Sequence, residues 1–155
     1  MEPRIAPVST NDLPVLNELV KKEFSYLDVD KFPFESKLSN PDFLLYKTVS
    51  DGVFSGFIEF EWIESWTVRM NGLVVAQGFR RQGLARTLLE FSLSELKKRG
   101  VESVVLIVAH DNAAAKKLYS EFGFSFDSIW SETIQGKEVE YWRLVFSSKP
   151  FVGVI

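Results

Sequence analysis

Apolar residues recur along this chain at two spacings, which together predict alternating strands and helices. A spacing of three or four residues predicts helices over Leu13 to Phe24 and over the longer amphipathic run Gly83 to Arg99. A third helix is expected after a cap at Asp111 or Asn112, ending near Gly123. Short apolar or alternating runs predict strands at residues 4–8, 43–49, 53–63, 66–76, 103–109, 124–131 and 138–146.

The order of these elements predicts how the strands pair. A strand, a long helix and a second strand follow one another from Leu73 to Ala109, which favours a parallel pair. Turn residues at Asp51-Gly52 and Gln135-Gly136 favour antiparallel hairpins on either side. The expected fold is therefore α/β, with a mixed sheet covered by helices on both faces. Asn71-Gly72, inside a strand, predicts a β-bulge.

Length and composition restrict the class of protein. The 155 residues suit one domain spanning 1–155 with one core, and a hydrophobic fraction of 46% is ordinary for a globular chain. A formal net charge of -3 does not favour a nucleic-acid surface. The chain has no cysteine and one histidine. This excludes disulfides, thiolate or multi-histidine metal sites and a cysteine-bound acyl group, so no metal is expected.

The sequence also predicts where the protein works. No apolar run reaches the roughly 18 residues that would span a membrane, and the first residues lack the apolar stretch of a signal peptide. We expect a cytoplasmic protein with no membrane partner. The apolar tail, residues 149–155, is compatible with packing on the body or in a homodimer.

One strand-to-helix junction carries the chemistry of an anion site. The strand Leu73-Val74-Val75 leads into a turn containing Arg80, Arg81, Gln82 and Gly83, and Leu84, Ala85, Arg86 and Thr87 open the helix. The first amides of a helix lack internal acceptors and lie at its positive end, so they favour a phosphate or pyrophosphate. Neither the dinucleotide fingerprint nor the P-loop spacing occurs here. Taken alone, a junction of this kind is more often an ordinary structural turn, because glycine is common wherever chains turn.

A second motif lies downstream, in Asn112-x-x-Ala115-x-x-Leu118-Tyr119-x-x-x-Gly123-Phe124. The two blocks, covering about residues 71–124, together resemble the GNAT superfamily of N-acetyltransferases, which use acetyl-coenzyme A. Gln77 stands where many members have proline, and Ala85 replaces a commoner glycine. Neither departure affects the expected cofactor binding.

The resemblance implies a fold and a set of roles. The two central parallel strands would splay apart to admit acetyl-coenzyme A, with the pyrophosphate on Arg80 to Thr87 and the pantetheine arm along Leu73 to Val75. An amide of Val75 or Val74 would stabilise the oxyanion. Tyr119 would be the general acid for the departing thiolate. Asn112 would bind pantetheine or simply cap its helix.

The general base and the acceptor are less specified by the sequence. Glu59 and Glu61 share one face of their strand, and Glu61 is the preferred base with Glu59 next, although both could be ordinary exposed acids. His110 is a further candidate for the base, although it precedes the cofactor-side helix, and Glu138 and Glu140 are candidates for binding a cationic acceptor. The acceptor is a primary amine of a small molecule, a lysine or a protein N-terminus, bound near residues 26–38 and 131–140. Two alternatives remain: a non-catalytic acyl-coenzyme A sensor, and a transferase of longer acyl groups.

Overall fold

The computed structural model describes residues 3–24 and 33–146. Thirteen elements alternate along this part of the chain: β1 (Arg4–Pro7), η1 (Thr10–Asp12), α1 (Leu13–Glu23), α2 (Phe34–Leu38), β2 (Phe43–Ser50), β3 (Val53–Glu64), β4 (Thr67–Val75), η2 (Gln77–Phe79), α3 (Leu84–Lys98), β5 (Ser103–Ala109), α4 (Ala113–Glu121), β6 (Ser125–Ile129) and β7 (Val139–Val145). The predicted acceptor segment at 26–32 and the tail at 149–155 lie outside the described residues.

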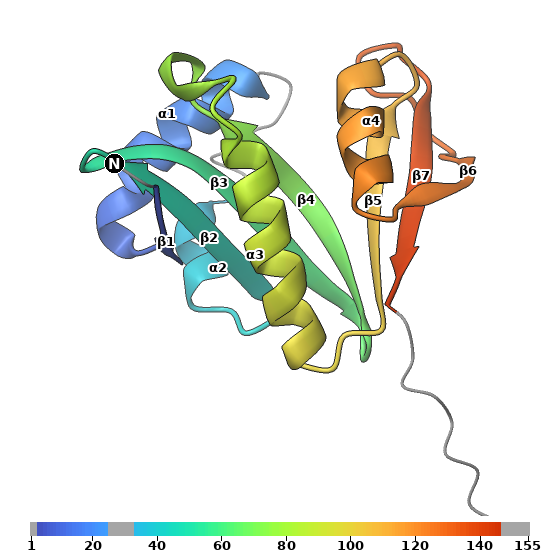
Figure 1. The fold of residues 1–155 in the computed structure, drawn as a ribbon, viewed down its shortest axis with the longest axis horizontal. Helices are drawn as coiled ribbons and strands as arrows, with labels where there is room; N and C mark the ends of the chain where they lie inside the picture. Colours follow the sequence, from blue (N-terminus) through green and yellow to red (C-terminus); the bar gives the residue numbers. More distant parts are fainter. Residues whose placement is uncertain (1–2, 25–32, 147–155) are drawn as a thin grey trace, which may run out of the picture.

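One seven-stranded sheet organises the fold, in the order β1-β2-β3-β4-β5-β7-β6. Its only parallel pair within the described residues is β4 with β5, and the mixed sheet is as predicted. Helices α3 and α4 cover one face and α1 and α2 the other (Figure 1). Each face has its own apolar cluster, one around Leu88, Leu89 and Leu96 of α3 and the other around Leu16 and Val20 of α1.

The parallel pair is short, and this opens the sheet. Strands β4 and β5 are paired only from Thr67 to Arg69 against Ser103 to Val105. Beyond that point they diverge toward the end of the sheet near α1 and α4 (Figure 1). Beyond this short pair, the backbone N–H and C=O groups on the facing edges of β4 and β5 do not bond to each other. They are therefore available to a ligand that enters the wedge between the two strands.

A bulge distorts β4 where the wedge begins. Glu59 of β3 opposes Gly72 and Phe60 opposes Met70, so Asn71 has no partner residue on β3. This is the bulge that Asn71-Gly72 predicted. An extra residue in one strand bends that strand and increases its twist.

Most element boundaries agree with the sequence prediction to within two residues. The last hairpin differs: β6 ends at Ile129, and the residues before β7 form a loop closed by a single bridge between Ile134 and Lys137. At that tip Gln135 and Gly136 both have positive φ, as a tight turn requires. In the described part of the chain, no helix is long and apolar enough to cross a membrane.

Candidate active site

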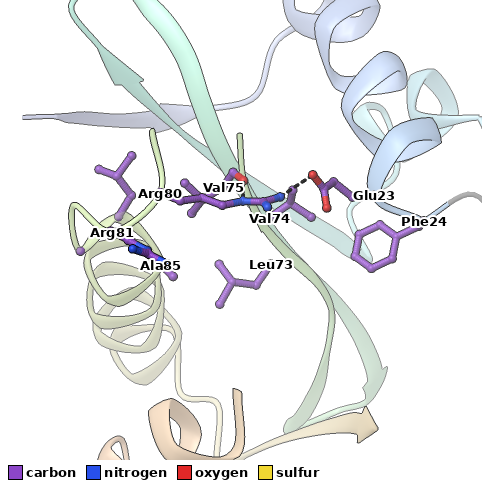
Figure 2. Close-up of a pocket in the computed structure, with 10 residues that line it drawn as sticks. Glu23, Phe24, Leu73, Val74, Val75, Arg80, Arg81 and Ala85 are labelled. Atoms are coloured by element: carbon purple, nitrogen blue, oxygen red, sulfur yellow. Dashed lines mark hydrogen bonds and ion pairs between the residues drawn. The ribbon is translucent and has the colours of Figure 1, made fainter. Parts of the chain in front are cut away.

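Two pockets meet along β4 and form one cleft. The first, of about 420 Å³, lies between the start of α3 and the end of α1 (Figure 2), and we call it the loop pocket. The second, of about 350 Å³, lies in the wedge between β4 and β5, and we call it the wedge pocket. Both pockets are lined by Glu23, Phe24 and Leu73, which connect them.

The loop pocket brings together most of the predicted cofactor residues. Its lining includes Leu73, Val74, Val75, Arg80, Arg81, Gly83, Leu84 and Ala85. Glu23 and Phe24, from the end of α1, complete it and were not predicted from the sequence. Nothing in the local pattern of α1 distinguishes these two residues, since only the packing of α1 places them opposite the loop.

The start of α3 has the chemical features of an anion site. Gly83 precedes the helix with φ of 77°, and Arg81 also has a positive φ of 64°. The Thr87 amide donates to the Gly83 carbonyl at 3.0 Å, which closes the first helical turn. In the described part of the chain no side chain caps this helix. The first amides of α3 therefore remain available, at the positive end of a 15-residue helix.

The three arginines of this region have different partners. Arg80 donates from Nε to the Val75 carbonyl at 3.1 Å and forms an ion pair with Glu23. Arg86 pairs with Glu121 and so joins the start of α3 to the end of α4. Within the ranges 3–24 and 33–146, Arg81 forms no ion pair. It lines the loop pocket and is the arginine whose charge is not already balanced.

Three predicted cofactor residues do not line the cleft: Arg86, which pairs with Glu121, and two residues that line separate hollows. Gln82 lines a separate hollow with Gly78, Phe79 and Asp51. The Thr87 hydroxyl donates back to the Gly83 carbonyl at 2.9 Å, and its side chain lines another hollow beside Phe91. Gln82 and Thr87 therefore do not line the cleft.

The end of β4 directs alternate amides into the cleft. The Ala76 amide donates to Ser55 of β3 at 2.8 Å, whereas the Val75 carbonyl accepts from Arg80 on the opposite side. Neighbouring residues of a strand direct their backbone groups to opposite edges. The amides of Val75 and Leu73 therefore face the cleft, and that of Val74 faces β3.

Helix α4 places Tyr119 and Asn112 along the wedge pocket. The Tyr119 ring packs against Phe124 at a centroid distance of 5.9 Å, and burial raises the pKa of its hydroxyl to about 12. Among the described residues this hydroxyl has no hydrogen-bond partner. The Asn112 side chain accepts from the Ala115 amide at 3.1 Å, so it caps α4.

The two predicted bases lie behind Asn71. Glu59 is only 3% exposed and accepts from Lys37 at 2.9 Å and from Asn71 Nδ2 at 2.7 Å. Glu61, 29% exposed, accepts from Arg69 and from the same Nδ2, both at 3.0 Å. Neither acid lines the wedge pocket, but Asn71 does. The bulge was predicted from the sequence, whereas the position of Asn71 between two acids and the cleft was not.

A separate cluster surrounds Glu140, which is 4% exposed on β7. Its carboxylate accepts from Trp142 Nε1 at 2.9 Å, Lys116 Nζ at 3.0 Å and His110 Nδ1 at 2.6 Å. The indole hydrogen bond, followed by those of Lys116 and His110, outweighs burial and lowers the pKa of Glu140 to about 2. Glu140 therefore ties β7 to α4 and to the end of β5, and its carboxylate is already occupied.

This cluster predicts acid-sensitive stability. A carboxylate whose pKa is about 2 when folded and near 4.5 when unfolded stabilises the fold above pH 4.5 and loses that effect as the pH falls toward 2. Glu140→Gln is expected to lower the free energy of unfolding at pH 7 by about 1 to 3 kcal/mol. Its difference from wild type should shrink as the pH is lowered. Urea unfolding at pH 7 and at pH 3.5 measures both values, and a pH-independent difference would contradict the role of the charge.

Comparison with known proteins places this site in a family. Residues 13–124 match the model of the Acetyltransferase (GNAT) family. The chain is 30% identical over 141 residues to the ribosomal protein bS18 alanine N-acetyltransferase of Escherichia coli K12, covering 86% of this chain and 90% of that protein.

Solved structures agree with this relationship. The crystal structure of the ribosomal-protein-S18-alanine N-acetyltransferase from Escherichia coli superposes with a TM-score of 0.86 at 26% identity, over 99% of this chain and 100% of that one. PaiA N-acetyltransferase from Thermoplasma acidophilum, solved in complex with coenzyme A, shares the fold with a TM-score of 0.75 at 20% identity, over 94% and 100% of the two chains.

The splayed sheet and the family match together define the class as an acyltransferase that uses a coenzyme A donor. The chain belongs to the GNAT family of acetyltransferases, as its two motifs predicted. It is an acetyl-coenzyme A dependent N-acetyltransferase, and relatives in this family use acetyl-coenzyme A as the donor.

Proposed function

We propose that this enzyme transfers acetyl from acetyl-coenzyme A to the α-amine of a protein N-terminus, by direct attack while both substrates are bound. Support for this acceptor class comes from the relative at 30% identity, which is named for the acetylation of an alanine in ribosomal protein bS18. The cleft fits the donor. Within the described residues it combines a helix start without a side-chain cap, an Arg81 without an ion pair and a pocket that continues to Tyr119.

The donor carries the thioester carbonyl that reacts, and residues of this chain would hold that carbonyl in position. The first amides of α3 and Arg81 would hold the pyrophosphate, and the cleft-facing amides of Leu73 and Val75 would hold the pantetheine arm. Gly83 leaves the approach to these amides free of a side chain. The Val75 amide is our choice for the donor to the carbonyl oxygen as that oxygen gains negative charge.

Tyr119 is proposed as the acid that protonates the departing thiolate. Tyr119 lines the wedge pocket and, in the described part of the chain, its hydroxyl donates to no other group. With a pKa of about 12, it stays protonated over the whole working range of pH. The hydroxyl therefore carries the proton that the departing thiolate needs.

Glu61 is our choice for the base that removes a proton from the amine. It is more exposed than Glu59, which is committed to Lys37. Both acids hold Asn71, whose position on the bulge places it between them and the wedge pocket. A proton would therefore reach Glu61 through water and not by direct contact with the substrate. In this arrangement Glu59 positions Asn71.

A peptide panel tests the acceptor class. Four ligands would share one sequence: an alanine-terminated hexapeptide with a lysine inside, its N-acetylated form, its lysine-acetylated form, and the form blocked at both sites. Thiol release and mass spectrometry would follow the reaction. We expect turnover with the first and third peptides only. Turnover only of the peptides with a free lysine, or turnover of small polyamines alone, would contradict the proposed acceptor. Release with none of them would favour a coenzyme A sensor.

A further inference from the structure

Glu23 occupies an unusual position, because it lines both the loop pocket and the wedge pocket. Among the described residues it is the only carboxylate that lines either pocket. The two predicted bases lie behind Asn71, and Glu140 is occupied by its own cluster. Of the acids that the structure describes, Glu23 is therefore the one on the walls of the cleft that an entering ammonium group would meet.

The surroundings of Glu23 make its negative charge unfavourable unless a cation lies nearby. It is the last residue of α1, so its carboxylate lies at the negative end of that helix, where a negative charge is unfavourable. Its side chain is only 26% exposed, which limits compensation by water. Arg80 provides the compensating charge, and Figure 2 shows the pair spanning the loop pocket. A second contact, from Lys22 Nζ to Gln77 Oε1 at 3.1 Å, holds the end of α1 over the same loop.

Arg80 also lies where the proposed function needs positive charge. It precedes the start of α3, beside Arg81, in the pocket proposed for the pyrophosphate. A pyrophosphate carries more charge than one carboxylate and accepts several hydrogen bonds from a guanidinium. When Arg80 turns to the pyrophosphate, Glu23 loses its partner at the negative end of α1.

We propose that Glu23 binds the ammonium group of the acceptor, and that binding of coenzyme A releases Glu23 for this role by drawing Arg80 onto the pyrophosphate. This inference rests on the proposed function for the acceptor class. It adds a binding residue and a coupling between the two substrates. Because coupling free energies are reciprocal, a bound acceptor ammonium must also strengthen the binding of coenzyme A.

Calorimetry with coenzyme A, which carries no acetyl group and cannot react, tests the proposal independently of turnover. In wild type, the alanine-terminated peptide should bind more tightly when coenzyme A is present. Glu23→Gln should weaken peptide binding to the loaded enzyme by about tenfold, because a charged hydrogen-bonded pair is lost. The same variant should bind coenzyme A roughly twofold to fivefold more tightly, because Arg80 is no longer held by an exposed ion pair.

Controls separate this role from general damage. Glu18→Gln changes an exposed acid on the same helix and should alter neither affinity. The N-acetylated peptide has no ammonium, so its binding should be equal in wild type and Glu23→Gln. Arg80→Gln should remove the coupling by leaving Glu23 free in both states, and the peptide should then bind this variant without coenzyme A.

Two results would overturn the proposal. Unchanged peptide affinity in loaded Glu23→Gln would show that Glu23 does not bind the amine. Weaker coenzyme A binding in the same variant would show that Glu23 holds Arg80 in its productive position. Failure of the proposed function looks different: the peptide would not be acetylated by wild type, whereas the effect of Glu23→Gln on coenzyme A affinity would still be measurable.

Discussion

Gly83→Glu is expected to abolish binding of coenzyme A, with a loss of affinity of at least about 100-fold and a matching loss of turnover. Gly83 has φ of 77°, which side-chain-bearing residues rarely adopt, and a cost of about 1 to 3 kcal/mol follows from that strain alone. The new carboxylate would also lie at the start of α3, where the phosphates are proposed to bind. Its negative charge would repel the ligand and occupy the free amides.

Two other substitutions divide this effect into its causes. Gly83→Ala has the same backbone strain without the charge, and a Cβ at this position meets no atom within 4 Å, so it should retain part of the affinity. Gly78→Glu puts the same charge in a neighbouring hollow that is not part of the cleft, and should bind coenzyme A nearly as wild type does. Calorimetry measures all three. Wild-type affinity in Gly83→Glu would refute the phosphate site.

Tyr119→Phe is expected to lower turnover by about 100-fold while changing acetyl-coenzyme A affinity by only a few-fold. The phenyl ring keeps the packing against Phe124, and the lost hydroxyl has no partner among the described residues, so the fold should be little affected. Only the proton donated to the thiolate is removed. Steady-state kinetics together with calorimetry separates the two effects.

The matched control is Tyr141→Phe. Tyr141 stacks on Trp130 at 5.5 Å, outside the cleft, and its variant should keep wild-type turnover. The pH profile is a second readout. Because the pKa of Tyr119 is about 12, wild-type turnover should show no loss from its ionisation below about pH 11. Equal turnover in Tyr119→Phe and wild type would remove Tyr119 from the chemistry.

Most residues of the loop pocket were predictable from the sequence because the pocket is built from local segments. The turn before α3 and the cap of α4 depend on residues a few positions apart, such as Gly83 with Leu84 and Asn112 with Ala115. Backbone amides at a helix start bind anions whatever the rest of the fold does. Even here, the direction of single side chains was not predictable. The Thr87 hydroxyl satisfies its own helix, and Gln82 faces another hollow.

The partners of the acidic residues were not predictable, because these contacts join residues that are far apart in the sequence. Glu23 contacts Arg80 across 57 positions, and Lys37 reaches Glu59 across 22. The alternation of β3 correctly places Glu59 and Glu61 on one face, where both bind Asn71. That pattern does not reveal that the Glu59 carboxylate already accepts hydrogen bonds from Lys37 and Asn71. Partners of this kind depend on how helices α1 and α2 pack on the sheet.

By itself, the sequence determined the mixed sheet, the parallel pair, the bulge at Asn71 and the two motifs that mark the GNAT family. All of these depend on periodicity, turn residues and helix ends, which act over a few neighbouring positions. Only the tertiary structure decided which charges are free and which are already balanced. Among the residues that the structure describes, Arg81 forms no ion pair, whereas Arg80, Arg86, Glu59 and Glu140 are paired. Such pairing depends on the approach of distant elements to within hydrogen-bond distance, and no local pattern encodes that distance.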